Sequence, residues 1–330
     1  MYYIKKQVHD FSKNTSTVET GMISAIIPVY SAKLSTLPKA LLSVDNQSYE
    51  KLQIIIVSDN AKGIDAIVQT VSLKHNFKIV YLSRNIGAAF ARNEGACVAN
   101  GEFLWFIDSD IVEIDSECAL YAMRKLKNNL DIGCIGGVLY SKNSYSSFVI
   151  GRISYTDHRY NLHQYRAIDD DYVNTACIFI PRNIFFLING FTDYIEYLHD
   201  DNDLGFKIRA AGYRCIGSYQ CAGIHPAPPC LPSIFHEFMS IKNTLLYLFI
   251  NYNISSFFEL LHKRKTYSCD EPLQKLTKSQ KIIDFSRKLC GKIMAVYFLL
   301  YHLSAIIQCR HERQSFLLNL PGVCKDSEKN

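Results

Sequence analysis

Two acidic clusters, about ninety residues apart, hold the side chains best suited to chemistry. The first is Asp108-Ser109-Asp110, which directly follows an apolar run at 103–107. Side chains at positions i and i+2 of an extended chain point the same way, so Asp108 and Asp110 can converge on one hard cation. The second cluster, Asp200-Asp201-Asn202-Asp203, could supply a general base. A metal clamp together with a base predicts transfer chemistry on a phosphate-bearing donor.

An alternation of strands and helices must position these residues. Short apolar runs at 23–29, 52–57, 78–82 and 102–107 predict strands, and the segments 34–46, 64–75 and 88–99 predict helices between them. This order predicts βαβ units, and therefore an α/β fold with a mostly parallel sheet flanked by helices. Ligands bind at the carboxyl ends of such strands. Because Asp59, Arg84 and Asp108 each follow a strand, we expect them on one rim of the sheet.

The pattern is looser beyond Asp110. We expect helices at 115–129 and 200–211, strands at 132–140 and 177–181, and an irregular, tyrosine-rich segment at 141–172. Long irregular segments inside compact domains are usually functional or disordered. We divide the chain into an N-terminal leader (1–21), a catalytic domain (22–235) and a helical, basic C-terminal extension (236–330).

Composition excludes several classes of protein. The chain has 330 residues, of which 48% are hydrophobic and 20% are charged, as in folded globular proteins. Its eleven cysteines include no CxxC pair, which disfavours structural zinc and fits reduced thiols in a cytosolic protein. No nucleic-acid-binding module or aromatic-basic ribbon occurs, so we expect no nucleic-acid partner.

The C-terminal extension combines positive charge with an apolar stretch. Residues 261–330 contain thirteen Lys and Arg against six Asp and Glu, a net charge of +7. The stretch 293–309 is slightly short for a membrane span, so we expect a buried or interfacial helix there. Such a combination is typical of contact with an anionic membrane surface, and a solvated basic face is the alternative. We therefore expect a cytoplasmic protein, either free or peripheral on the inner face of the cytoplasmic membrane.

Seven short motifs occur in order within residues 22–250. They are Ile26-Ile27-Pro28-Val29-Tyr30, Ile56-Val57-Ser58-Asp59-Asn60-Ala61, Arg84-Asn85-Ile86-Gly87-Ala88, Ala91-Arg92-Asn93-Glu94-Gly95, Asp108-Ser109-Asp110, Asn189-Gly190-Phe191 and Asp200-Asp201-Asn202-Asp203-Leu204. Together they resemble the family 2 glycosyltransferases, which have the Rossmann-like GT-A fold. Within that family the chain is most similar to rhamnosyltransferase-like enzymes of bacterial surface polysaccharides.

The resemblance implies a site for a nucleotide-sugar donor, UDP- or dTDP-linked. The implied donor-binding residues are Pro28, Tyr30, Asp59, Arg84, Asn85, Gly87, Arg92 and Asp108. The family's position at Asp59 touches the base, and a guanidinium such as that of Arg84 suits phosphate. The alternatives are an Asx-turn or a helix cap at Asp59 and a surface salt bridge at Arg84. Asp108, Asp110 and His225 would hold Mn²⁺ or Mg²⁺, although a lone histidine is more often packed or hydrogen-bonded.

The second cluster matches the family's catalytic acids. Asp201 would act as the base in an inverting transfer of a sugar to a hydroxyl group of a glycan or lipid-linked glycan. Its neighbour Asp200 would raise the pKa of Asp201 or orient it, while Asp203 would cap the helix. The alternative for the acidic pair is helix capping alone. The Gln-x-x-Arg-Trp motif of processive synthases is absent, which favours a hexosyltransferase that adds a single sugar.

Two other functions stay open at this point. A nucleotidyltransferase also uses an acidic metal site on a parallel sheet, but its usual glycine-rich loop is missing after the first strand. A degenerate, non-catalytic module that only binds glycan or membrane is the other alternative. The intact acidic residues of both clusters argue against it.

Overall fold

The computed structural model describes residues 17–31, 34–143, 146–150, 154–156, 162–164, 174–195, 198–225, 233–264 and 278–320. Its centre is an eight-stranded sheet in the order β10-β5-β9-β4-β1-β2-β3, with β6 paired to β5. The strands are β1 (Glu19–Val29), β2 (Leu52–Asp59), β3 (Asn76–Leu82), β4 (Gly101–Ile107), β5 (Ile132–Asn143), β6 (Ser146–Ile150), β9 (Cys177–Pro181) and β10 (Arg214–Ile224). A separate pair is formed by β7 (Ser154–Thr156) and β8 (Leu162–Gln164).

The sheet is mostly parallel, as the alternation of elements predicted. Strand β1 pairs in parallel with β2 and β4, β2 with β3, and β10 with β5. Strand β9 is antiparallel to both β4 and β5, and β6 is antiparallel to β5. Strands β1, β2 and β4 are almost wholly buried, because continuous apolar runs can be covered on both faces of a sheet.

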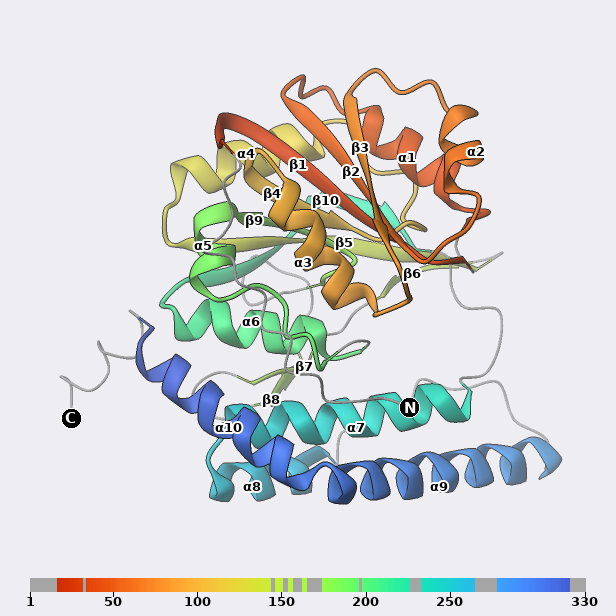
Figure 1. Ribbon diagram of the computed structural model, residues 1–330, viewed down its shortest axis with the longest axis vertical. Helices are drawn as coiled ribbons and strands as arrows, with labels where there is room; N and C mark the ends of the chain where they lie inside the picture. The colour runs from red at the N-terminus through yellow and green to blue at the C-terminus, as the bar shows by residue number, and fades with distance from the viewer. Residues whose placement is uncertain are drawn as a thin grey trace.

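Helices cover both faces of the sheet (Figure 1). Apolar residues of α1 (Leu37–Asp45), α2 (Ile64–Gln69) and α4 (Cys118–Asn128) form one core cluster. Those of α3 (Ala88–Val98), α5 (Arg182–Leu187) and α6 (Asp200–Ala210) form the other. Small residues let α3 approach closely, since a Cβ at Gly95 would lie 2.4 Å from Cγ2 of Ile26.

The C-terminal helices form a further layer on the side of α6 away from the sheet (Figure 1). They are α7 (Ile234–Asn251), α8 (Ile254–Arg264), α9 (Lys278–Tyr301) and α10 (Leu303–Leu318). Helix α10 runs back toward the catalytic domain, where Leu317 and Leu320 join the same core cluster as α3 and α6. The extension is therefore packed into the core of the domain that precedes it.

Several predictions from the sequence need correction. The helix expected at 64–75 ends at Gln69, before the strand β3 begins at Asn76. Strand β10 and helix α5 were not predicted. The apolar stretch 293–309 is not one helix, because the chain turns at His302 and the helices on either side are bent by 75°. In the segment 141–172, the first three residues end strand β5, and other parts form strands β6, β7 and β8. The remainder lies outside the described residues, as does most of the leader.

Candidate active site

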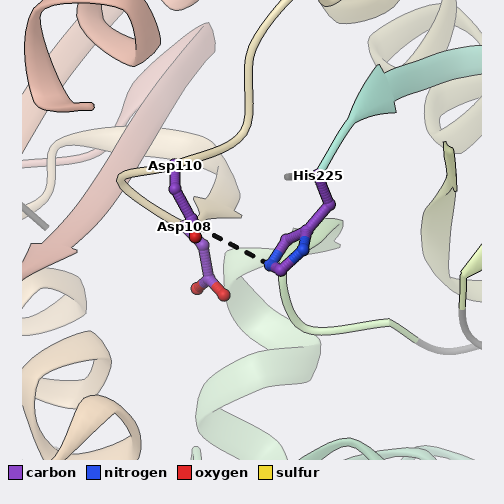
Figure 2. Close-up of side chains that lie close together, drawn as sticks. All are labelled: Asp108, Asp110 and His225. Carbon is purple, nitrogen blue, oxygen red and sulfur yellow. Dashed lines mark ion pairs between the residues drawn. The ribbon is translucent and has the colours of Figure 1, made fainter. Parts of the chain in front are cut away.

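The acidic turn after β4 joins the end of β10. Strand β4 ends at Ile107, and Asp108 begins a turn in which the Ile111 amide donates to the Asp108 carbonyl at 3.1 Å. Asp110 is buried, and one of its carboxylate oxygens lies 3.7 Å from Nε2 of His225 (Figure 2). His225 follows β10 directly, and its amide donates to the carbonyl of Tyr140 at 2.9 Å. Two distant strand ends thus meet at one point.

Asp108, Asp110 and His225 form the only group of three side chains among the described residues whose ligand atoms could hold a metal ion. One ligand atom from each lies within 4.8 Å of the others. Two carboxylates and an imidazole suit a divalent ion such as Mn²⁺ or Mg²⁺. The Nδ1 atom of His225 is buried and makes no hydrogen bond within the described part of the chain. The side chains fit the metal site that the sequence predicted, whose occupancy and role stay a prediction.

Arg92 joins the two acidic clusters. This buried residue of α3 donates from Nη2 to Asp108 at 2.6 Å and from Nη1 to Asp200 at 2.8 Å. Burial disfavours its charge, but the negative charges of Asp108 and Asp200 outweigh burial and raise the pKa of Arg92. Burial, together with the charge of Asp110, raises the pKa of Asp108 despite Arg92. The sequence placed Arg92 only among the donor-binding residues, and its bridging position is new.

The second cluster forms the first turn of α6. Asp200 accepts hydrogen bonds from Arg92 and, at 3.0 Å, from the hydroxyl of Thr175. Oδ1 of Asp201 accepts hydrogen bonds from the amide and from Nδ2 of Asn202, at 2.8 and 3.2 Å. Burial, and then the charge of Asp200, raise the pKa of Asp201 to about 7. A base works best with a pKa near neutrality, which suits Asp201 to that role.

Helix α7 of the extension holds the residues just before this cluster. Leu198 and His199 both have positive φ angles, 62° and 66°, which are unfavourable for side chains with a Cβ. Nδ2 of Asn243 donates to the Leu198 carbonyl at 3.1 Å, and the Thr244 hydroxyl lies 2.8 Å from Nε2 of His199. These contacts stabilise the backbone conformation from which Asp200 and Asp201 project.

Asp203 does not cap α6, contrary to the prediction. Its carboxylate is buried and accepts hydrogen bonds from Arg313 of α10 and Asn251 of α7, both at 2.8 Å, and from the hydroxyl of Thr192. The position before the helix is His199, which makes no side-chain cap. The sequence could not distinguish these roles, because the cationic partner lies more than a hundred residues away.

Asp59 holds a loop in place. Its two carboxylate oxygens accept hydrogen bonds from the amides of Ile86 and Gly87, at 2.8 and 2.9 Å. Burial raises the pKa of Asp59, and these two hydrogen bonds partly offset the effect. This loop also carries Arg84 and Asn85, which are exposed. The contact of Asp59 with a nucleotide base stays a prediction.

The remaining predicted donor residues lie at the end of β1. Pro28 is buried in the strand, whereas Tyr30, just beyond it, is 43% exposed. The ends of β1, β2, β3 and β4 lie on one rim, because these strands are parallel neighbours in the sheet. The donor-binding role of Pro28 and Tyr30 stays a prediction.

Comparison with known proteins agrees with this geometry. Residues 24–186 match the family model described as Glycosyl transferase family 2. This segment is a family 2 glycosyltransferase domain. In sequence, the chain is 32% identical to the poly-β-1,6-N-acetyl-D-glucosamine synthase of Staphylococcus epidermidis over 132 residues, which are 40% of this chain and 31% of that protein. The chain matches about a third of the length of the curated relatives.

Solved structures share the GT-A glycosyltransferase fold over most of the chain. A mannosyltransferase from Pyrobaculum calidifontis, in complex with GDP-Man and Mn²⁺, has a TM-score of 0.54 at 14% identity and covers 93% of this chain and 89% of its own. TarS residues 1–349 from S. aureus, in complex with UDP-GlcNAc, has a TM-score of 0.56 at 14% identity, covering 93% and 91%. The expected fold is confirmed, and the family match supports the expectation of a glycosyltransferase.

Proposed function

We propose that this family 2 glycosyltransferase domain transfers a sugar from a nucleotide-sugar donor to a hydroxyl group of a glycan or lipid-linked glycan, with inversion. The observation that carries the proposal is the position of Arg92, which ties the acidic turn of Asp108 to the acidic pair Asp200-Asp201. A donor diphosphate bound at the turn would thereby lie next to a base. The related structures with bound UDP-GlcNAc and GDP-Man support a nucleotide-sugar donor.

The chain's own residues account for the acceptor's activation. The carboxylate of Asp201 takes the proton of the acceptor hydroxyl as the hydroxyl oxygen attacks the anomeric carbon and the bond to the nucleotide breaks. Attack opposite the departing nucleotide inverts the configuration. General-base help of this kind is worth roughly 10²–10⁴ in rate. Arg92 and Thr175 hold Asp200 beside Asp201, and burial together with the charge of Asp200 raises the pKa of Asp201.

Asp108, Asp110 and His225 would hold Mn²⁺ or Mg²⁺. When bound, the ion supplies positive charge to the diphosphate of the leaving nucleotide. The protein itself would work in the cytoplasm, at the inner face of the membrane, where a lipid-linked acceptor is available. The polymers named for the bacterial relatives support an acceptor in surface polysaccharide synthesis.

Donor binding can be tested by thermal shift with UDP, GDP, CMP and dTDP, each with Mn²⁺, Mg²⁺ or EDTA. A ligand that binds only the folded state raises the melting temperature by mass action. We expect one nucleoside diphosphate to stabilise the protein only when metal is present. Asp110→Asn should abolish this metal-dependent stabilisation. A protein that no nucleotide stabilises under any of these conditions would contradict the proposal.

The base can be tested on its own. Asp201→Asn should abolish release of the nucleotide product in the presence of acceptor and leave the donor-induced melting shift unchanged. Asp131→Asn makes the same chemical change at an exposed position before β5 and should behave as the wild type. Equal loss of donor binding and transfer in Asp201→Asn would show that Asp201 binds donor and is not the base.

A further inference from the structure

Helix α9 lies on the edge of the molecule farthest from the sheet (Figure 1). One face of this helix exposes a continuous stripe of apolar side chains. The side chains of the stripe are between 46% and 70% exposed, and they recur every three or four residues, so they lie on one face of the helix. They are Phe285, Leu289, Ile293, Val296, Tyr297 and Leu300. Single exposed apolar residues are ordinary, but a contiguous patch of this kind marks a surface that binds something.

The opposite face of α9 is packed on α7, which fixes the direction of the stripe. Arg287 forms an ion pair with Glu237 at 3.3 Å, and the Phe298 ring lies 5.9 Å from the ring of Phe238. Ala295 is fully buried in the same contact. At Gly291 the helices are so close that a Cβ would lie 2.7 Å from Cβ of Glu237. The stripe therefore cannot turn inward without separating the two helices.

The charges beside the stripe indicate what covers it. Lys288 and Lys292 are exposed, and their spacing of four residues places them along one edge of the stripe. No acidic residue occurs between Phe285 and Tyr301. A dimer formed through this face would bring the same stripe of both copies together, because a twofold axis pairs identical surfaces. The lysines of each copy would then face a stripe without carboxylates, which disfavours a dimer. Anionic lipid headgroups would supply the negative charge, because lysine stems can lie along apolar surface while the ammonium groups stay in water.

A membrane in contact with α9 would have to lie along the helix, because the packing of α10 prevents the pair from crossing it. No single helix in the described part of the chain is long and apolar enough to span a bilayer, but α9 and α10, bent by 75°, pass that test together. Insertion of α10 would pull Arg313 away from Asp203 and Leu317 out of the core. The stripe from Phe285 to Leu300 is about 23 Å long at the rise of an α-helix, enough for a helix lying flat at the interface.

We propose that the outward face of α9 binds an anionic lipid surface, with the stripe in the acyl boundary and Lys288 and Lys292 among the headgroups. The proposal rests on the proposed location at the membrane but not on the transfer reaction. It assigns the contact to one helix face and fixes how the catalytic domain is held relative to the bilayer.

The test is sedimentation of the full chain with vesicles of phosphatidylcholine, with or without phosphatidylglycerol. We expect the wild type to sediment with the anionic vesicles and far less with the neutral ones. Ile293→Glu should weaken binding at least about tenfold, because it removes a large apolar side chain and adds a charge at the interface. Lys288→Gln with Lys292→Gln should reduce the preference for anionic vesicles.

The matched control is Leu130→Glu, the same kind of change at an 82% exposed residue between α4 and β5. It should bind as the wild type does. Equal sedimentation of Ile293→Glu and wild type, or no sedimentation of the wild type, would overturn the proposal. So would a concentration-dependent dimer that Ile293→Glu abolishes without any vesicle binding. A nucleotide-induced melting shift on the same preparations separates failure of this surface from failure of the proposed reaction.

Discussion

Replacement of Arg313 by Met should destabilise the protein strongly, because it leaves a buried carboxylate without its main partner. Arg313 donates from Nη1 to Asp203 at 2.8 Å and from Nη2 to the hydroxyl of Thr192 at 2.6 Å. Asp203 is 1% exposed and Arg313 is 7% exposed. Met has a similar length and packs well in a core, so the change removes charge and hydrogen bonds more than volume.

The expected loss in the free energy of unfolding can be bounded from the contacts that Asp203 keeps in the variant. Removal of one partner from a buried ion pair typically costs about 3–5 kcal/mol. Asp203 would keep the amide of Asn251 at 2.8 Å and the ammonium of Lys207 at 3.8 Å. These partners place the loss of stability at the lower end, about 3 kcal/mol. For a chain of 330 residues this corresponds to a fall of roughly 4–5 °C in melting temperature.

The assay is urea unfolding followed by the fluorescence of Trp105, the only tryptophan, which is buried in β4. Arg214→Met is the matched control, because Arg214 pairs with Asp131 at the same 2.8 Å but both side chains are more than half exposed. Exposed pairs contribute little, so this variant should unfold almost as the wild type does. Equal destabilisation by the two substitutions would refute the reasoning, since burial would then make no difference.

The pH dependence gives a second check on the same variant. Arg313 and Lys207 outweigh burial and hold the pKa of Asp203 well below its usual range. A depressed carboxyl pKa stabilises the folded state above the unfolded pKa, about 3.9, and that contribution is lost as pH falls through the folded value. The stability difference between wild type and Arg313→Met should therefore be full at pH 7 and narrow below about pH 4. If the stability difference between the two proteins stays constant at acid pH, the effect of Arg313→Met does not come from the charge of Asp203.

Two further predictions concern the site itself. Because the pKa of Asp201 is raised to about 7, the transfer rate should rise about tenfold per pH unit below pH 7 and level off above it. The rate is measured with saturating donor and metal. A rate that is unchanged between about pH 5 and 8 would exclude Asp201 as the base. Asp59→Asn should weaken donor binding by destabilising the loop at Ile86 and Gly87, since an amide nitrogen would face a backbone N–H, at a cost of about 1–3 kcal/mol. Isothermal titration with the preferred nucleotide measures this effect, and unchanged affinity would show that the loop does not contribute.

The rim of the sheet could be predicted because it depends on local patterns. A buried run such as 103–107 followed by Asp108 indicates a strand and its end, and parallel topology then brings separate strand ends together. Strand β10 was harder to predict, since it contains two glycines and only two β-branched residues, Ile216 and Ile224, and its register shifts against β5. The end of α9 and start of α10 around His302 could not be predicted either, because residues 293–309 are apolar on both sides of it.

The partners of the acidic residues could not be predicted in the same way. Nothing near Asp203 in the sequence indicates Arg313, because the pair joins segments 110 residues apart. One signal for Arg92 was available, however. An arginine set among Ala88, Ala89 and Ala91 in a helix packed on the sheet is expected to be buried, and a buried guanidinium requires anionic partners. That reasoning would have pointed to the two acidic clusters.

The C-terminal extension is part of the catalytic unit in physical terms. Its α7 holds the strained backbone at Leu198 and His199, and its α10 supplies the guanidinium that neutralises Asp203 within α6. A unit that ended at residue 235, the boundary drawn from the sequence, would lack both supports and would bury Asp203 without Arg313. Since α9 is packed on α7, a lipid surface bound by α9 would also be joined through α7 to the helix that carries Asp201. The packing of α9 on α7, and of α7 on α6, would then determine both the position of the protein at the membrane and the position of its proposed base.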